Sequence, residues 1–424
     1  MERRTVGMIL FVLVILCVAF DQTEAESKKL SSSTLHREAI VVDGHVHITN
    51  SVFNQGIDPW KVQPTGTFDY ARAKEGGLDV VIEQVYVDDR YNSYNYTVKQ
   101  ACRLIETFYR VLDANRDKME LALSSADVRR IVARGKMAVI LALEGGFDTE
   151  GDLDVLRLFH RLGVRMVQLT NHDVSNVIAD GYAGEQKWKG ISDHGRTVIQ
   201  EMNRLGIIID MSHASAAAKL QSIQASRAPV VTSHNGLLHF ANFVGNLSDE
   251  TLKALAAKGG MIGLHSAGWI ISQKGNDWAR AHWYYPPSRS VTKSVTKSAI
   301  FRPPGVDYGD YIAKMDAEMR DLWNRWGYGR PWRENHQEAI EADAPLPTVE
   351  EWADQIDYVV RLVGADYVGM GLDMMAGGNW LRDFDATSYP RLTEALVAKG
   401  YTPTVIRKIL GENWLRLLDA AKVP

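Results

Sequence analysis

The chain carries at residues 40–47 the stretch IVVDGHVH, an apolar run that ends in polar side chains. Seven more apolar runs of similar length follow, at residues 78–87, 138–145, 164–170, 206–213, 228–234, 259–265 and 367–373. Each has the length of a buried parallel strand, and most are rich in Val, Ile and Leu. The pattern therefore predicts eight buried strands.

Segments with helical spacing of apolar residues lie between these runs, clearest at 127–134, 199–205 and 251–258. Strands that alternate with helices favour βαβ units and a parallel sheet. Eight such units indicate closure into a (β/α)8, TIM-like barrel rather than an open sheet.

Length and composition agree with one large globular domain. The chain has 424 residues, of which 46% are hydrophobic and 24% charged. Barrels of this type often exceed 250 residues as a single domain. The formal net charge of -4 is small, and no basic stripe occurs, so nucleic acid is not expected as a partner.

One region, residues 267–347, interrupts the alternation of strands and helices. It contains no clear strand, is rich in Trp and Tyr, and includes a helical pattern at 311–326. We predict an insertion after the seventh strand, on the face where loops build the active site. A lid over the site and a subdomain packed on the flank remain equal alternatives. Beyond it, residues 389–420 predict two helices, with Gly400 and Gly411 at their ends.

The N-terminus resembles a secretory signal. Arg3 and Arg4 precede an apolar run at 8–20, and a small residue, Ala25, marks a cleavage point. Thirteen apolar residues are short for a membrane span, although an uncleaved anchor is the alternative. We therefore expect residues 1–25 to be a signal or anchor, 26–37 a linker and 38–424 the barrel domain, with export to the periplasm or the extracellular space.

The two cysteines do not predict a disulfide. Cys17 lies in the apolar run, which leaves Cys102 without a partner once that run is removed.

Polar residues gather at the carboxyl ends of the predicted strands. They are His45 and His47 at the first strand, Glu144 at the third, His213 at the fifth, His234 at the sixth and Asp373 at the eighth. Each alone has an ordinary explanation: a histidine bonded to nearby backbone, a first exposed glutamate, or an aspartate capping a helix. In a barrel, however, these strand ends converge on one place. The combination predicts a functional site.

The residue types point to metal-dependent hydrolysis. Imidazole nitrogen and carboxylate oxygen both bind zinc, and manganese or iron also fits such ligands. We predict two divalent ions, one held by His45 and His47 and the other by His213 and His234, with Glu144 bridging them. Water between two such ions loses a proton near neutral pH and attacks a polarised carbonyl. Asp373 is placed to take that proton and pass it to the leaving amine.

At these residues the sequence resembles the membrane dipeptidase (renal dipeptidase) family, within the amidohydrolase-type barrels. The shared motifs are GG at 76–77, LEGG at 143–146, LGVR at 162–165, GIS at 190–192, LGIIIDMSH at 205–213, PVVTSH at 229–234, VGMGLD at 368–373 and GENWLR at 411–416. The resemblance places the bridging glutamate on Glu144, the second-metal histidines on His213 and His234, and the catalytic aspartate on Asp373.

Three positions depart from the family pattern. His47 stands where the family usually has Asp, which makes the first metal position one charge more positive. Gly245 falls near the arginine that binds the substrate carboxylate in the renal enzyme, and glycine cannot do so. The substrate-contacting histidine falls at Asn171, with His172 beside it, and either residue can take that role.

The sequence thus predicts a binuclear, zinc-dependent dipeptidase that acts through a metal-bridging hydroxide on a small-molecule substrate. Hydrolysis of another amide or ester, or tailoring of a secreted metabolite, is the alternative that Gly245 suggests. A non-catalytic binding protein is a weaker alternative, because the metal positions hold competent ligands. Membrane association through the N-terminus and a homodimer are left open.

Overall fold

The computed structural model describes most of the chain. The described residues are 31–64, 67–88, 91, 96–145, 152–170, 174–183, 185–282, 312–317, 345–374 and 381–421. The predicted signal or anchor at 1–25 lies outside them. Within the described residues, no helix is both long and apolar enough to cross a membrane.

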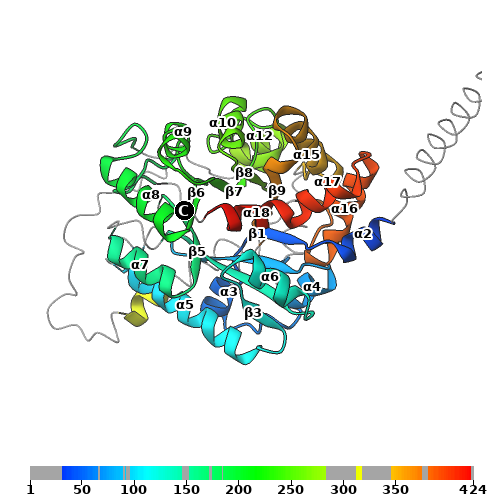
Figure 1. Cartoon of the computed structure of the whole chain (residues 1–424), viewed down its shortest axis with the longest axis horizontal. Coiled ribbons are helices and arrows are strands. Elements are labelled where there is room, and N and C mark those ends of the chain that lie inside the picture. Colours follow the sequence, from blue (N-terminus) through cyan, green and yellow to red (C-terminus); the bar gives the residue numbers. More distant parts are fainter. Residues whose placement is uncertain are drawn as a thin grey trace, which may run out of the picture.

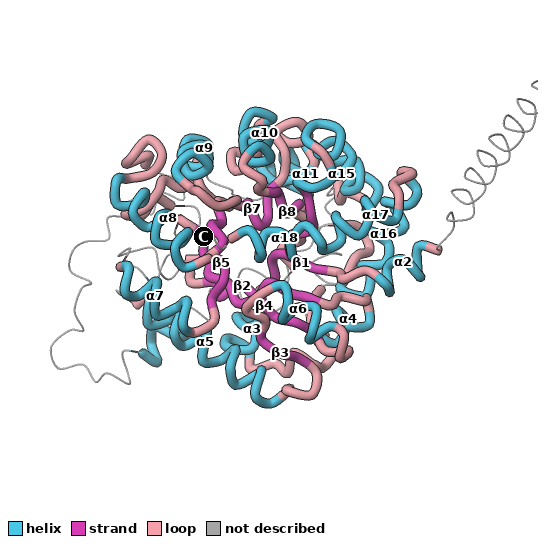
Figure 2. The backbone as a smooth tube through the Cα atoms, in the orientation of Figure 1, coloured by secondary structure: helices cyan, strands magenta, loops and turns pink. Residues whose placement is uncertain are grey.

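Eight parallel strands form a nearly closed barrel, as the sequence predicts (Figures 1 and 2). They are β1 (Val42–Val46), β2 (Val80–Tyr86), β4 (Met137–Glu144), β5 (Val164–Gln168), β6 (Ile208–Asp210), β7 (Val231–Asn235), β8 (Met261–Leu264) and β9 (Val368–Met370). Neighbours in this order are hydrogen-bonded, and each strand pairs with the next in parallel. A bridge between Val46 and Met374 brings the first and last strands together at the carboxyl end.

A ninth strand, β3 (Met119–Leu121), was not predicted. It pairs with residues 137–139 of β4, whereas β5 pairs with residues 141–143 of that strand. Since β2 occupies one edge of β4 along its length, β3 and β5 share the other edge. The extra strand therefore widens the sheet at the amino end of β4 and leaves the carboxyl rim unchanged.

Helices surround the strands (Figure 2). They are α3 (Ile48–Gln55), α4 (Tyr70–Glu75), α5 (Thr97–Ala114), α6 (Ser125–Val132), α7 (Leu153–Arg161), α8 (Asp193–Leu205), α9 (Ala216–Ala225), α10 (Asp249–Ala257), α11 (Gly268–Ile271), α12 (Gln273–His282), α15 (Val349–Val363), α16 (Tyr389–Ala398), α17 (Pro403–Arg407) and α18 (Asn413–Ala420). Many begin at a Ser, Thr or Asp whose side chain accepts a hydrogen bond from the first turn, as Ser124, Ser192 and Thr348 do. Such caps satisfy amide groups that have no partner within the helix.

The amino-terminal boundary of the folded part differs from the prediction. Much of the expected linker is a helix, α2 (Ser32–Glu38), which Ser31 caps. Its Leu35 and His36 are buried, and the His36 ring bonds Thr393 Oγ1 at 2.7 Å and the Gly76 carbonyl at 2.9 Å. Residues 32–37 therefore belong to the barrel domain.

The C-terminal region also differs in one respect. Gly400 ends α16, as predicted, but Gly411 does not end a helix. It lies in a π-helical turn, Lys408–Glu412, that runs directly into α18. A Cβ atom at position 411 would lie 2.1 Å from the Ile40 carbonyl oxygen, so glycine lets this turn approach the start of β1.

The predicted insertion is described at 267–282, 312–317 and 345–347. These residues contain α11, α12 and a helical segment at 312–317, and no strand. Arg103 of α5 forms an ion pair with Asp316 at 2.6 Å, and Met315 is buried. The rest of the predicted helix at 311–326 lies outside the described residues, so the choice between lid and flank stays a prediction.

A tryptophan fills the interior of the barrel. Trp414 of α18 packs with inward residues of the strands, such as Val80 and Ile82, and its indole N–H donates to the Met370 carbonyl at 2.9 Å. A Cβ atom at Gly44, on β1, would lie 2.0 Å from the indole ring. In Figure 1, α18 crosses the middle of the strand ring. The barrel therefore closes around this side chain.

Replacing Trp414 by alanine is expected to lower the free energy of unfolding by about 3–5 kcal/mol, because the cavity left behind cannot collapse between rigid strands. Urea titration of both proteins measures the change. Leu158→Ala, on the exposed side of α7, is the control and should change stability by less than about 0.5 kcal/mol. Equal stability of the Trp414 variant and wild type would contradict the role of the indole as the core of the barrel.

Candidate active site

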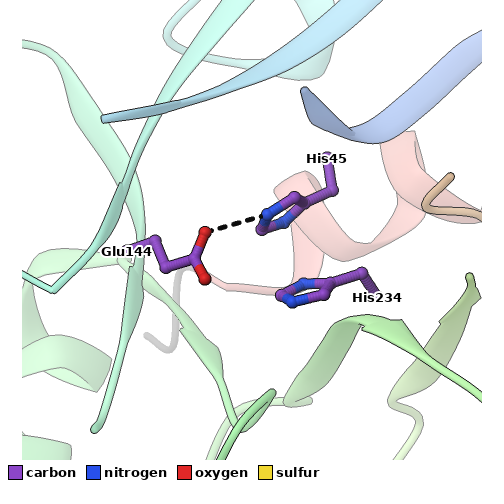
Figure 3. Close-up of side chains that lie close together, drawn as sticks. All are labelled: His45, Glu144 and His234. Atoms are coloured by element: carbon purple, nitrogen blue, oxygen red, sulfur yellow. Dashed lines mark hydrogen bonds and ion pairs between the residues drawn. The ribbon is translucent and has the colours of Figure 1, made fainter. Parts of the chain in front are cut away.

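The six predicted metal and catalytic residues come together at the carboxyl end of the barrel. His45 lies in β1, Glu144 ends β4 and His234 lies in β7. His47 precedes α3, His213 follows β6 by three residues, and Asp373 follows β9 by three residues. Figure 3 shows the side chains of His45, Glu144 and His234 pointing toward one another from three different strands.

Glu144 lies at the centre of the group. Its Oε2 is 3.0 Å from His45 Nε2 and 3.2 Å from His47 Nε2. Its Oε1 is 3.1 Å from His213 Nε2. The two oxygens of one buried carboxylate thus face two different sets of histidines, which is the arrangement that a bridging ligand requires.

The imidazole nitrogens crowd one another. His45 Nε2 lies 2.9 Å from His47 Nε2, and His213 Nε2 lies 2.7 Å from His234 Nε2. All four rings are buried or nearly so. Buried polar atoms that converge in this way are stable when they share a proton or coordinate a cation.

The donor atoms fit divalent metal ions. Two groups have ligand atoms that all lie within 4.8 Å of one another: His45 with Glu144 and His234, and His45 with His47 and Asp373. Nitrogen and carboxylate donors without cysteine are typical of catalytic rather than structural sites. The grouping differs from the predicted pairs. His45 lies in both groups, with its ring centroid 3.7 Å from that of His234, whereas Asp373 lies in one group and His213 in neither.

The charge states of His45, His234 and Glu144 also suit metal binding. Burial lowers the pKa of His45 and, with repulsion from His45, holds the pKa of His234 well below its usual value. Burial alone would raise the pKa of Glu144, but the surrounding histidines outweigh it and hold that pKa well below the usual range. Neutral imidazole and ionised carboxylate are the forms that bind metals.

Asp373 is held by a histidine that the sequence analysis did not include. His265, after β8, accepts hydrogen bonds at Nδ1 from the amides of Ser266 and Ala267, at 2.8 and 2.9 Å. Its Nε2 therefore carries the proton and donates to Asp373 Oδ2 at 3.2 Å. The other carboxylate oxygen, Oδ1, faces His47 Nε2 at 3.1 Å. His265 ends an apolar run at 259–265, so the rule that found the other ligands would also have found it.

The backbone is strained at two of these residues. His213 and Asp373 have positive φ angles of 62° and 56°, in the left-handed region. Non-glycine residues adopt this conformation infrequently, and it concentrates at functional sites. Asp43 supports the backbone beside Asp373. Its Oδ1 accepts hydrogen bonds from the amides of His45 at 3.1 Å and Leu372 at 3.0 Å. The loop that carries Asp373 is thereby tied to β1.

The surroundings of Gly245 leave no room for a long side chain without rearrangement. A Cβ atom there would lie 2.8 Å from the Phe243 ring and 3.1 Å from the Tyr182 ring. Tyr182 in turn stacks on His213, with ring centroids 5.6 Å apart and planes 24° apart. Aromatic side chains therefore lie beside His213, where the sequence comparison expects an arginine.

A buried lysine supports this loop. Lys219 Nζ donates to the carbonyls of Ala214 at 2.6 Å and Gly245 at 3.0 Å, and burial lowers its pKa to about 7. An unfolded chain would hold the proton up to a pKa near 10.4. Between these values the unfolded state binds more protons, so this group makes stability rise with pH.

The variant Lys219→Met is expected to remove that dependence. Between pH 7 and pH 9, the free energy of unfolding of the wild type should rise relative to the variant, by up to about 1.4 kcal/mol per pH unit. Urea titrations at several pH values measure the difference. Lys253→Met, at an exposed position of α10, serves as the control. A difference that stays constant or falls with pH would contradict the inferred protonation.

Asn171 and His172, predicted to contact the substrate, lie outside the described residues. Their roles therefore stay predictions.

A parallel barrel with a buried cluster of histidine, glutamate and aspartate at its carboxyl rim is the architecture of metal-dependent hydrolases. Residues 30–423 match the model of the family described as membrane dipeptidase (peptidase family M19). The chain belongs to this family of metal-dependent dipeptidases.

Curated proteins that resemble this chain are also named dipeptidases. Dipeptidase tcpJ of Claviceps purpurea (strain 20.1) is 26% identical over 385 residues, which cover 87% of this chain and 74% of that protein. Dipeptidase aclJ of Aspergillus oryzae (strain ATCC 42149 / RIB 40) is 27% identical over 346 residues, covering 79% and 65%.

Solved structures share the fold. The probable dipeptidase PvdM from Pseudomonas aeruginosa superposes with a TM-score of 0.72 at 24% identity and covers 92% of this chain and 97% of its own. A metallo peptidase from Rhodobacter sphaeroides, liganded with a phosphinate mimic of the dipeptide L-Ala-D-Ala, has a TM-score of 0.67 at 22% identity, covering 90% and 99%.

Proposed function

We propose that this chain is a binuclear metal-dependent dipeptidase. The observation that carries the proposal is the position of Glu144, whose two oxygens lie 3.0–3.2 Å from nitrogens of His45 and His47 on one side and His213 on the other. With His234, these residues supply ligands for two ions. Zinc is the first choice for such donors, and manganese or iron is the alternative.

Two bound ions would supply a water of lowered pKa and polarise the scissile carbonyl. The residues of the chain then have distinct tasks. Glu144 and the histidines hold the ions in place. The Asp373 carboxylate, whose Oδ1 lies 3.1 Å from His47 Nε2, accepts a proton and delivers it to the leaving amine. His265 fixes the carboxylate by bonding Oδ2, and the 20% exposure of the Asp373 side chain gives a substrate access to it.

A dipeptide is the proposed substrate. Family membership supports it, and so does the relative from Rhodobacter sphaeroides, which was crystallised with a mimic of a dipeptide. Export, proposed from the pattern of residues 1–25, would place the reaction outside the cytoplasm.

A second candidate is hydrolysis of an amide or ester that lacks a free carboxylate at the Gly245 side of the site. The packing of Tyr182 and Phe243 around Gly245 favours it, because aromatic rings there would receive an apolar group better than an anion. This candidate uses the same metal ligands and differs only in substrate class.

Metal removal tests both candidates. We expect chelated protein to release no amino acids from a panel of L,L- and L,D-dipeptides, and protein restored with zinc, manganese or iron to regain cleavage. Loss of the ions removes both the nucleophile and the polarising charge, so the rate should fall by at least about 10³-fold. Elemental analysis of the restored protein should give two ions per chain.

The same panel should include N-acyl amino acids and dipeptide amides. Faster cleavage of these than of free dipeptides would favour the second candidate. Two bound ions without cleavage of any compound would contradict both, and full activity after complete metal removal would contradict the metal-dependent reaction itself.

A further inference from the structure

Beneath the histidines, a single hydroxyl group contacts ligands of both proposed metal positions. Ser233 Oγ lies 3.0 Å from His45 Nδ1 and 2.8 Å from His234 Nδ1. It is fully buried, as are both rings. His45 comes from β1 and His234 from β7, so this serine joins ligands from two strands that are not neighbours in the sheet.

The direction of each hydrogen bond follows from Asp210. Its Oδ1 accepts the amides of Ser212 and Ser233, each at 2.9 Å, and its Oδ2 lies 2.5 Å from Ser233 Oγ. An ionised carboxylate only accepts hydrogen bonds, and a serine hydroxyl has one proton to give. Ser233 therefore donates to Asp210, and its oxygen is left as an acceptor with two lone pairs. The histidine nitrogens, at 2.8 and 3.0 Å, lie nearer to this oxygen than the Ser212 hydroxyl, at 3.3 Å.

The two histidines, as the nearer groups, then donate to Ser233 from Nδ1. Each neutral imidazole has one N–H and one lone pair. With the proton on Nδ1, the lone pair of each ring is on Nε2. His45 Nε2 lies 3.0 Å from Glu144 Oε2, and His234 Nε2 lies 2.7 Å from His213 Nε2, so both Nε2 atoms are at the metal-binding group. Without a cation, Glu144 Oε2 accepts and competes with Ser233 for the proton of His45, so we expect the Nδ1 tautomer of His45 in the metal-bound protein and that of His234 in both forms.

We propose that Ser233, oriented by Asp210, is a positioning residue that fixes the tautomer of His45 and His234 together. It thereby prepares one ligand of each metal position at the same time. The inference rests on the proposed function in its metal-binding part, but its first consequence, the tautomer of His234, can be measured in the metal-free protein. Substitution of Ser233 alone should weaken metal binding at both positions. Loss of a ligand that holds only one ion would first weaken binding at the position of that ion.

The tautomers can be measured without any variant. In wild type labelled with ¹⁵N at histidine, we expect proton-bearing Nδ1 and unprotonated Nε2 for His234 in the metal-free protein and for His45 in the zinc-loaded protein. Single His→Gln variants assign the signals among the 12 histidines. A proton on Nε2 of either ring under these conditions would overturn the proposal, whether or not the protein hydrolyses a dipeptide.

The variant Ser233→Ala tests the consequence for metal binding. We expect both rings to become mixtures of tautomers and the affinity for zinc, measured by calorimetric or competitive titration, to fall by about 10- to 100-fold at both positions. Ser233→Thr keeps the hydroxyl and should restore the Nδ1 tautomers. Affinities unchanged at either position in Ser233→Ala would overturn the proposal.

Thr232→Val is the matched control. Thr232 is the adjacent residue in β7, is equally buried, and its hydroxyl has no hydrogen-bond partner within the described residues. Its loss should leave tautomers and zinc affinities as in wild type. Failure of wild type itself to bind two ions would count against the proposed function, whereas the tautomer result separately decides the role of Ser233.

Discussion

Replacing Glu144 by glutamine is expected to abolish turnover and to disturb both metal positions. The amide keeps the shape of the side chain but removes the negative charge, and one of its two terminal atoms becomes a donor that cannot bind a cation. Since Oε1 and Oε2 face different histidines, no rotation of the amide serves both. We expect fewer than two ions per chain and a loss of at least about 10³-fold in kcat/KM.

Elemental analysis together with a dipeptide-release assay measures both effects. The control is Glu83→Gln, a buried carboxyl in the neighbouring strand β2 that bonds the Thr49 amide at 2.7 Å and Tyr70 at 3.1 Å. It should retain two ions and most of the activity. Two ions per chain and wild-type turnover in the Glu144 variant would refute the bridging role.

The variant Asp373→Asn should separate chemistry from metal binding. The amide cannot accept and release a proton in the relevant pH range, so we expect kcat to fall by about 10²- to 10⁴-fold. The metal content should remain at the wild-type value, because Glu144 and the four histidines supply the main ligands. Single-turnover assays on metal-saturated protein, with metal analysis of the same sample, test this pair of expectations.

Asp383→Asn is the matched control for backbone strain. Asp383 also has a positive φ, 52°, but lies at an exposed position, and asparagine tolerates this conformation well. It should leave kcat unchanged. If Asp373→Asn lost its ions in proportion to its activity, the residue would be a ligand rather than a proton carrier.

The sequence predicted the eight barrel strands because each is an apolar run of suitable length that faces both the interior and the helices. β3 escaped this rule, since Met119–Leu121 is short and gains its place from pairing with part of β4. The helix α2 was also missed. Its Ser- and Lys-rich surroundings suggested a linker, and the burial of Leu35 depends on residues distant in the sequence.

The candidate site was predicted for a similar reason. The ends of parallel strands converge, so six scattered residues could be expected in one place without knowledge of their contacts. The tautomers that Ser233 sets and the positive φ of His213 and Asp373 could not be predicted, because they depend on distances between strands. The role of Gly411 could not be predicted either, because it depends on a contact with a distant residue. It suggested the end of a helix, yet it allows close contact with Ile40.

Trp414 has a consequence for how the molecule is made. The indole lies against Gly44, so the first strand of the barrel is in contact with a residue 370 positions later in the chain (414 minus 44). During translation, β1 emerges from the ribosome long before the side chain that fills the space beside it. A nascent chain that already holds every histidine of the site therefore still lacks the centre of its barrel, and the reactive group of residues can become rigid only after α18 has been synthesised.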